Sequence, residues 1–354
     1  MNWKNKLAQK LTIDFPFIQA PMLGITSPEM VAMISNKGAL GSLPLGLTTK
    51  EQAAALIKAV KRQTSRAFSV NLFVYKESTL DRLPPQQILR SFYSRYNLHY
   101  PDNVITEDPF PSFKQLIDIL IEEKIPVISF TFGIPDSSIV DRLKSKGCML
   151  IGSASSVEEA KLIEDHGLDI VVAQGIEAGG HRASFLEKTI PQTGLISLVP
   201  QVTDAVRIPV VAAGGLMQGR SIAAAFVLGA AGVQIGSAFL RSTESMASTT
   251  YKASIAASTD TSTVLTNAWT GKFARGIESN FSMEMQKEEI LPYPFQIYYT
   301  DRIRKKGKEQ DLEDIQAFWA GQSSCFAKDQ NADVIISDLI TDTESVLEGT
   351  NMLF

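Results

Sequence analysis

The chain has 354 residues, of which 44% are hydrophobic and 20% are charged, and its formal net charge is −4. This composition is typical of a globular protein rather than of a disordered or fibrous one. The slight negative charge gives no electrostatic reason to expect a nucleic acid or an anionic membrane as a partner.

Short apolar segments alternate with amphipathic ones from the N-terminus to about residue 258. Each apolar segment is brief and rich in Val, Ile, Leu or Phe, as expected of parallel strands that are covered on both faces. The predicted strands span residues 16–20, 39–45, 68–74, 126–132, 148–154, 169–175, 209–215 and 232–240.

Helix signals occupy most of the segments between these strands. Ser27, Pro28 and Gly38 mark the start, the first turn and the end of one helix. Ser156 and Glu159 have the spacing of a capping box at the start of another. Strands that alternate with helices in this way close most naturally into a (β/α)8 TIM barrel, and an open doubly wound sheet is the alternative.

Two regions interrupt the alternation. Residues 75–112 form an insertion after the third strand, and residues 259–354 follow the last barrel helix. We therefore expect a barrel over residues 1–258, with the inserted segment, and a smaller C-terminal segment over 259–354. Because an insertion after a barrel strand emerges at the face that carries active sites, the two regions are expected to form a helical cap over the mouth.

Three sequence features indicate where in the cell the protein is expected: the N-terminal segment, the apolar runs and the cysteines. The longest apolar runs are interrupted by glycine and glutamine, so no membrane-spanning helix is expected. The N-terminal segment lacks the apolar core and cleavage site of a signal peptide. Cys148 and Cys325 predict neither a disulfide framework nor a Cys-x-x-Cys metal site. A reduced, cytoplasmic setting is the expectation.

Residues that are unusual for strands gather at the predicted C-terminal ends of the strands, where barrel enzymes keep their catalytic groups. Each one alone also has a structural interpretation, because glycine pairs make turns and buried amides tie loops to backbone groups. The residues concerned are Pro21, Met22, Asn71, Gln174, Gly175, Gly214, Gly215, Gly236 and Ser237.

The seventh and eighth strands end in glycine-containing corners, Gly214-Gly215 and Gly236-Ser237, and each corner is followed by a predicted helix. Glycines allow backbone N–H groups to approach a ligand closely, and a helix start adds partial positive charge. The loops after these two strands form the recurrent phosphate site of TIM barrels. The pattern therefore predicts a bound phosphate monoester, on either a substrate or a cofactor.

His181 is the candidate catalytic residue among the three histidines. It follows the sixth strand, and Gly179 and Gly180 leave room beside it for a flat or bulky ligand. Imidazole titrates near neutrality, so His181 can exchange a proton or bind a small anion, although a loop histidine bonded to the backbone is the alternative. His166 is expected to cap a helix, and His99 is expected to be an inert loop residue. Without a His, Cys, Asp or Glu partner at ligand spacing, no metal site is predicted.

The segments "IQAPMLG", "VNLFV", "AQGIEAGGHR", "PVVAAGG" and "GVQIGSAFL" resemble those of the nitronate monooxygenases, formerly called 2-nitropropane dioxygenases. The resemblance extends over about residues 11–325 and includes "ARGI" at 274–277 and "WAGQS" at 319–323. It implies a TIM barrel that binds FMN noncovalently, with the phosphate on the seventh and eighth strand–helix turns and His181 in the active site. The implied flavin contacts are Pro21, Met22, Asn71, Gln174, Gly179, Gly180, Gly214, Gly215, Gln234, Ile235, Gly236 and Ser237.

The resemblance also implies a reaction, the oxidation of an alkyl nitronate such as propionate 3-nitronate with O2 to a carbonyl compound and nitrite, which would detoxify nitronates. The expected partners are thus a small-molecule nitronate and O2, and the expected assembly is a monomer or a homodimer. Leu23 and Ala183 depart from the family pattern and bear on the size of the substrate.

Other functions remain open on the same scaffold. They are a flavin-dependent enoyl-acyl-carrier-protein reductase, an NAD(P)H:quinone reductase, and a flavin-free barrel such as a sugar-phosphate isomerase or a non-catalytic phosphate-binding protein. Gln174 before Gly175 favours the nitronate reaction over the enoyl reductase.

Overall fold

A closed ring of parallel strands forms the centre of the molecule. The computed structural model describes residues 3–75, 80, 83–101, 105, 110, 113–186 and 190–350. The ring strands are β1 (Phe17–Gln19), β2 (Ser42–Pro44), β3 (Ser69–Phe73), β4 (Val127–Thr131), β5 (Met149–Ala154), β6 (Ile170–Gln174), β8 (Val210–Ala213) and β9 (Gly232–Ile235). Within the described residues they form one eight-stranded sheet in the order β1-β9-β8-β6-β5-β4-β3-β2. A parallel bridge between Ile18 and Leu40 joins its two ends. The fold is a TIM barrel, as predicted, and not an open sheet.

All of the strands predicted for the barrel are confirmed, and each is somewhat shorter than its apolar segment. The largest difference is in the eighth, for which the apolar pattern predicts a strand to residue 240 but which ends at Ile235. Gly236 turns the chain away from the sheet, and Ser237–Phe239 form a single 3₁₀ turn, η1, in place of the helix expected there.

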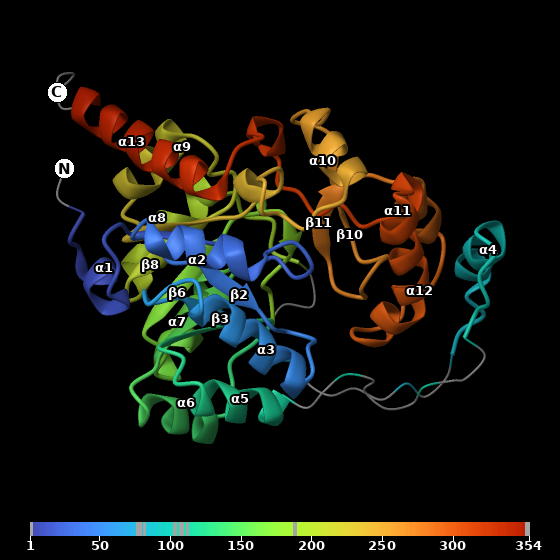
Figure 1. Cartoon of the computed structure of the whole chain (residues 1–354), viewed down its shortest axis with the longest axis horizontal. Helices are drawn as coiled ribbons and strands as arrows, with labels where there is room; N and C mark the ends of the chain where they lie inside the picture. The colour runs from blue at the N-terminus through green and yellow to red at the C-terminus, as the bar shows by residue number, and fades with distance from the viewer. Residues whose placement is uncertain are drawn as a thin grey trace.

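A layer of helices surrounds the ring (Figure 1). Its members are α2 (Pro28–Asn36), α3 (Lys50–Lys61), α5 (Phe113–Glu122), α6 (Ser137–Lys144), α7 (Val157–Asp165), α8 (Leu195–Ala205), α9 (Gly219–Val227) and α13 (Ala332–Thr350). Helix α13 contacts both α9 and α2, and Figure 1 shows it alongside α9. The last helix of the described chain therefore fills the position between the seventh and first helices of the barrel.

The helix caps follow the sequence signals, with one correction. Ser27 accepts a hydrogen bond from Met30 N at 3.1 Å, and Ser156 accepts one from Glu159 N at 3.2 Å. The predicted capping box at Ser156 is incomplete, because the buried Glu159 carboxylate accepts instead from Ser155 N, at 2.7 Å, and from Phe185 N, at 2.6 Å. Glu159 thus ties α7 to the loop that follows β6.

The interior of the barrel changes from apolar to polar along its axis. At the N-terminal ends of the strands, Leu7 and Leu11 of α1 (Lys6–Leu11) pack against Val127, Ile151 and Val211. Because side chains alternate along a strand, the inward positions nearer the C-terminal ends come every second residue. These positions include Asn71, Ser129, Thr131, Ser153 and Gln174. Apolar side chains therefore fill the N-terminal end of the barrel, and the polar C-terminal end is the end that suits a ligand.

A smaller lobe lies at the mouth of the barrel (Figure 1). Its core unites the insertion with the C-terminal region, since Leu89 and Phe92 of the insertion share one apolar cluster with Phe281, Phe295 and Tyr299. Residues 76–79, 81–82, 102–104, 106–109 and 111–112 of the predicted insertion lie outside the described residues. The elements of this region are α4 (Gln87–Arg95), α10 (Thr249–Ala256), β10 (Thr263–Thr266), β11 (Ala274–Ile277), α11 (Asn280–Met285), α12 (Phe295–Gln310), η2 (Glu313–Ile315) and η3 (Ser324–Phe326).

A small antiparallel sheet joins the lobe to the barrel. Strand β7 (Gly180–His181) pairs with β11, which pairs with β10, and His181 lies opposite Ala274. We propose that the chain has two parts, a barrel and a smaller lobe over the cavity mouth. This division is close to the expected one, except that α13 is counted with the barrel on which it packs.

Cys148 is buried, Cys325 is exposed, and both are free thiols. Among the described helices, none combines the length and the apolar character needed to cross a bilayer.

Candidate active site at the barrel mouth

A cavity of about 350 Å³ opens at the C-terminal ends of the strands, which is within the size range of small-molecule sites. Every residue predicted to contact the flavin lines it, as does His181, whereas Gly175 does not, so the fold brings together residues from several different strand ends and the loop after β6. Their roles in binding and catalysis stay predictions. They are Pro21, Met22, Asn71, Gln174, Gly179, Gly180, His181, Gly214, Gly215, Gln234, Ile235, Gly236 and Ser237.

The cavity also has lining residues that sequence reasoning missed. Thr131 and Ser153 occupy the polar inward layer of β4 and β5, where their alternation with buried apolar residues was a detectable signal. Thr270, Arg304 and Trp319 come from the smaller lobe, and no local pattern relates them to the barrel. Of the two positions that bear on substrate size, Leu23 lines the cavity and is 40% exposed, and Ala183 lines it from a buried position.

The glycine corners bring three loops together at one end of the cavity. Gly214 and Gly215 have φ angles of +129° and +69°, which only glycine adopts readily. A Cβ atom at Gly179 would lie 2.5 Å from Gly321 N, so this loop packs directly on the backbone of the C-terminal segment. Gly321 N also donates to Ser237 Oγ at 3.0 Å. Because η1 is a single short turn, the partial positive charge expected at Ser237 is smaller than a helix would give.

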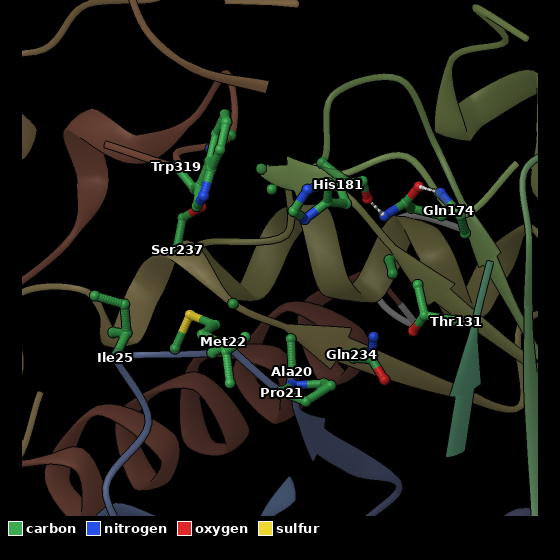
Figure 2. Close-up of a pocket in the computed structure, with 18 of the residues that line it drawn as sticks. Ala20, Pro21, Met22, Ile25, Thr131, Gln174, His181, Gln234, Ser237 and Trp319 are labelled. Carbon is green, nitrogen blue, oxygen red and sulfur yellow. Dashed lines mark hydrogen bonds between the residues drawn. The ribbon is translucent and has the colours of Figure 1, made fainter. Parts of the chain in front are cut away.

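Gln174 fixes the loop that carries His181. Its Nε2 donates to the carbonyl of His181 at 2.9 Å, and its Oε1 accepts from Ala183 N at 2.9 Å (Figure 2). The buried Arg182 donates to the same Oε1, also at 2.9 Å. Gln174 is half-buried, and it ties the loop to backbone groups, as the structural interpretation expects, while it also lines the cavity.

Glu177, in the "EAGG" string, has a structural role. Both of its carboxylate oxygens accept a hydrogen bond from Leu195 N, at 2.8 and 3.0 Å. Leu195 is the first residue of α8, whose N-cap Gly194 has no side chain to do this. The carboxylate therefore caps α8.

Aromatic rings surround the imidazole of His181. The ring centroids of Phe132 and Trp319 lie 5.3 and 5.5 Å from that of His181. In Figure 2, His181 and Trp319 face the cavity from the side opposite Met22. The Nε2 atom of His181 lies 2.9 Å from Thr270 Oγ1. The histidine is thus held in an apolar enclosure with one polar contact from the smaller lobe.

His181 is half-buried in the cavity wall, and its desolvated ring and two neighbouring cations keep it neutral. Burial lowers the pKa of His181 to about 3, and the positive charges of Lys272 and Arg304 contribute to this lowering. Lys272 Nζ lies 4.7 Å from the centroid of the Phe132 ring, and its pKa is also lowered by burial. Among the described residues, Arg304 Nε is buried and has no hydrogen-bond partner. This arrangement disfavours a further positive charge and favours an anionic ligand.

The depressed pKa of His181 predicts a pH-dependent stability. An unfolded histidine takes up a proton near pH 6.5, whereas folded His181 stays neutral down to about pH 3. The unfolded state therefore binds more protons between these values, and the free energy of unfolding decreases as the pH falls through this window, by at most about 1.4 kcal/mol per unit. We expect urea denaturation at about pH 7 and pH 5 to show a smaller decrease for His181→Asn than for the wild type. An equal decrease in both proteins would contradict a His181 that stays neutral in the folded protein.

A family model and a named relative give the same family, and two solved structures have a similar fold. The chain matches the family model "Nitronate monooxygenase" over residues 4–342. It is 43% identical, over 354 residues, to a Staphylococcus aureus (strain MSSA476) protein named "Probable nitronate monooxygenase", covering 98% of this chain and 99% of that protein. A nitroalkane oxidase from Streptomyces ansochromogenes has a similar structure, with a TM-score of 0.89 and 31% identity over 97% of this chain and 99% of that one. FabK from Thermotoga maritima has a TM-score of 0.79 and 28% identity over 99% of both chains.

Proposed function

Because the chain belongs to the nitronate monooxygenase family and is an oxidoreductase, we propose that it oxidises alkyl nitronates with O2, using bound FMN. Propionate 3-nitronate represents the substrate class, and the products are a carbonyl compound and nitrite. In this proposal the removal of nitronates is a detoxifying activity of a cytoplasmic enzyme.

The cavity residues fit an FMN molecule. Gly214, Gly215 and Gly236 present backbone without side chains at the mouth, and helix α9 begins at Gly219, shortly after the first of these corners. Such a corner suits a phosphate group. Asn71 and Gln234 line the cavity as amide side chains, which suit the polar edge of a flavin ring. When bound, the flavin would accept electrons from the nitronate and deliver them to O2.

The observation that carries the choice of substrate is the charge pattern around His181. A nitronate is an anion, and the neutral imidazole lies near Lys272 and Arg304, whose charges are partly desolvated. Asp301 Oδ1 lies 3.5 Å from Arg304 Nη2, but the Asp301 side chain is 64% exposed, so it offsets little of the positive charge of Arg304. The two cations attract the anion, and the aromatic enclosure excludes water from it.

We expect the purified protein to be yellow, to release FMN on denaturation, and to consume O2 and form nitrite when propionate 3-nitronate is added. Absorption spectra, oxygen uptake and nitrite analysis measure the three results. A colourless preparation that added FMN does not restore would contradict the flavin, and a flavoprotein without nitrite formation would contradict the substrate.

The same preparation separates the reductase alternatives. An enoyl reductase or a quinone reductase on this scaffold would oxidise NAD(P)H with a crotonyl thioester or a quinone under anaerobic conditions. We expect these rates to be negligible beside the nitronate rate. Substantial NAD(P)H oxidation without nitronate turnover would favour a reductase.

A further inference from the structure

We infer that Thr270 is a positioning residue, which fixes His181 as the tautomer that carries its proton on Nε2 and so makes Nδ1 the atom that serves the substrate. This inference rests on the proposed function for its consequence. The tautomer itself is a property of the protein that can be measured without turnover.

The hydrogen bonds of Thr270 determine the tautomer. The hydroxyl group has one proton, and two atoms lie 2.9 Å from its oxygen: the carbonyl oxygen of Lys272, which can only accept, and His181 Nε2, which can accept or donate. Both contacts are hydrogen bonds only when the hydroxyl donates to the carbonyl and its oxygen accepts from His181 Nε2. An acceptor at this position requires a proton on Nε2. Since burial and neighbouring cations keep the imidazole neutral, its other nitrogen then has none.

The turn that holds Thr270 is rigidly placed by the smaller lobe. Thr270 is buried, and the next residue, Gly271, has a φ angle of +83°. A Cβ atom at Gly271 would lie 2.4 Å from the carbonyl oxygen of Leu291, so this turn packs directly on the segment before α12. Thr300 of α12 donates to the carbonyl of Trp269 at 2.7 Å. These contacts hold the hydroxyl in one place relative to the lobe.

The backbone of His181 is held from the other side. Gln174 binds its carbonyl, and Arg182 N donates to the carbonyl of Phe273 at 2.9 Å. The imidazole can therefore respond to Thr270 mainly by the choice of its protonated nitrogen and by small ring rotations. Among the described residues, no hydrogen bond to His181 Nδ1 is present, and the ring lines the cavity. Nδ1 is thus the nitrogen available to hold or receive a proton next to a bound substrate.

The inference has a consequence for the lobe. The histidine belongs to the loop after β6, whereas the group that sets its proton belongs to the turn before β11. The smaller lobe therefore completes the active site in addition to covering it. Removal of the Thr270 hydroxyl should impair the reaction without impairing FMN binding, since we propose that the glycine corners hold the phosphate.

The test compares Thr270→Val with Thr270→Ser in the FMN-loaded protein. Valine keeps the branched shape of the side chain and removes the hydroxyl, whereas serine keeps the hydroxyl. In protein labelled with 15N-histidine, we expect His181, assigned by difference with His181→Asn, to show a protonated Nε2 and an unprotonated Nδ1 in the wild type and in Thr270→Ser. Thr270→Val should lose this pattern. A wild-type histidine protonated on Nδ1, or an unchanged pattern in Thr270→Val, would overturn the inference.

Kinetics give the second measurement. We expect Thr270→Val to lower kcat for propionate 3-nitronate by about 10- to 100-fold, the cost typical of losing the partner that orients a functional histidine, while the Kd for FMN stays within about twofold. Thr270→Ser should recover most of the rate. Full activity of Thr270→Val, or an equal loss in the serine variant, would also overturn the role. A wild-type protein with the expected 15N pattern but without nitronate turnover would instead contradict the proposed function alone.

Discussion

His181→Ala is expected to retain FMN and to lose nitronate turnover by about 10²- to 10⁴-fold, the range that a positioned acid–base group contributes. The imidazole lines the cavity and is the titratable group of the loop after β6 that faces Trp319. The glycine corners that are proposed to hold the phosphate make no contact that this substitution removes. Oxygen uptake, nitrite formation and flavin content per chain, measured on the same preparation, give the result.

The main competing explanation for a loss of activity is collapse of the loop. The hydrogen bonds that place this loop use backbone atoms of His181 and Arg182, which bind Gln174 and Phe273. Alanine retains these backbone groups, so we expect the loop to stay in place. His166→Ala provides the matched control, because His166 caps α7 at the surface, where its Nδ1 lies 2.8 Å from the carbonyl of Leu162. Unchanged turnover in His181→Ala, or an equal loss in His166→Ala, would show that His181 has no chemical role.

The barrel was predictable because its signals are local. Each strand is a short apolar run that both faces of the sheet bury, and caps such as Ser27 mark the helices between them. The glycine corners were predictable for the same reason, since Gly214 and Gly215 interrupt an apolar strand at its end. The comparisons with known proteins then confirmed the family that these segments resemble.

The residues that the smaller lobe contributes to the site were not predictable, because their positions depend on contacts between segments that are distant in the sequence. Strand β7 has two residues, too few for any alternation to be detected, yet its pairing with β11 places His181 near Thr270. Helix α13 begins only at Ala332, long after β9 ends at Ile235, and only packing shows that it belongs to the barrel. The reassigned carboxylate of Glu159 has the same origin, because its partners in the loop after β6 become neighbours only when the barrel closes.

Gly215→Leu is expected to weaken FMN binding by at least about 100-fold, or about 2.7 kcal/mol, and to give protein that purifies largely without flavin. A Cβ atom at this position would lie 3.5 Å from the Cβ of Glu177 and 3.6 Å from Ser323 Oγ, which is ordinary contact. The first carbon of the side chain therefore fits, and because Gly215 lines the cavity, we expect the rest of the leucine to extend into the space where we propose the phosphate to lie. Titration of the apoprotein with FMN, followed by flavin fluorescence, measures the Kd.

The backbone strain of this substitution needs a control of its own, because the φ angle of Gly215 is +69° and a left-handed leucine costs about 1–2 kcal/mol. Gly167→Leu supplies it. Gly167 has a φ angle of +79°, a Cβ atom added to it would have no neighbouring atom within 4 Å, and it follows α7 away from the cavity. Both variants should lose a similar amount of thermal stability, and only Gly215→Leu should lose FMN. Stoichiometric flavin in Gly215→Leu would show that the phosphate lies elsewhere. Flavin loss in both variants would show that backbone strain, and not contact with the phosphate, causes the loss.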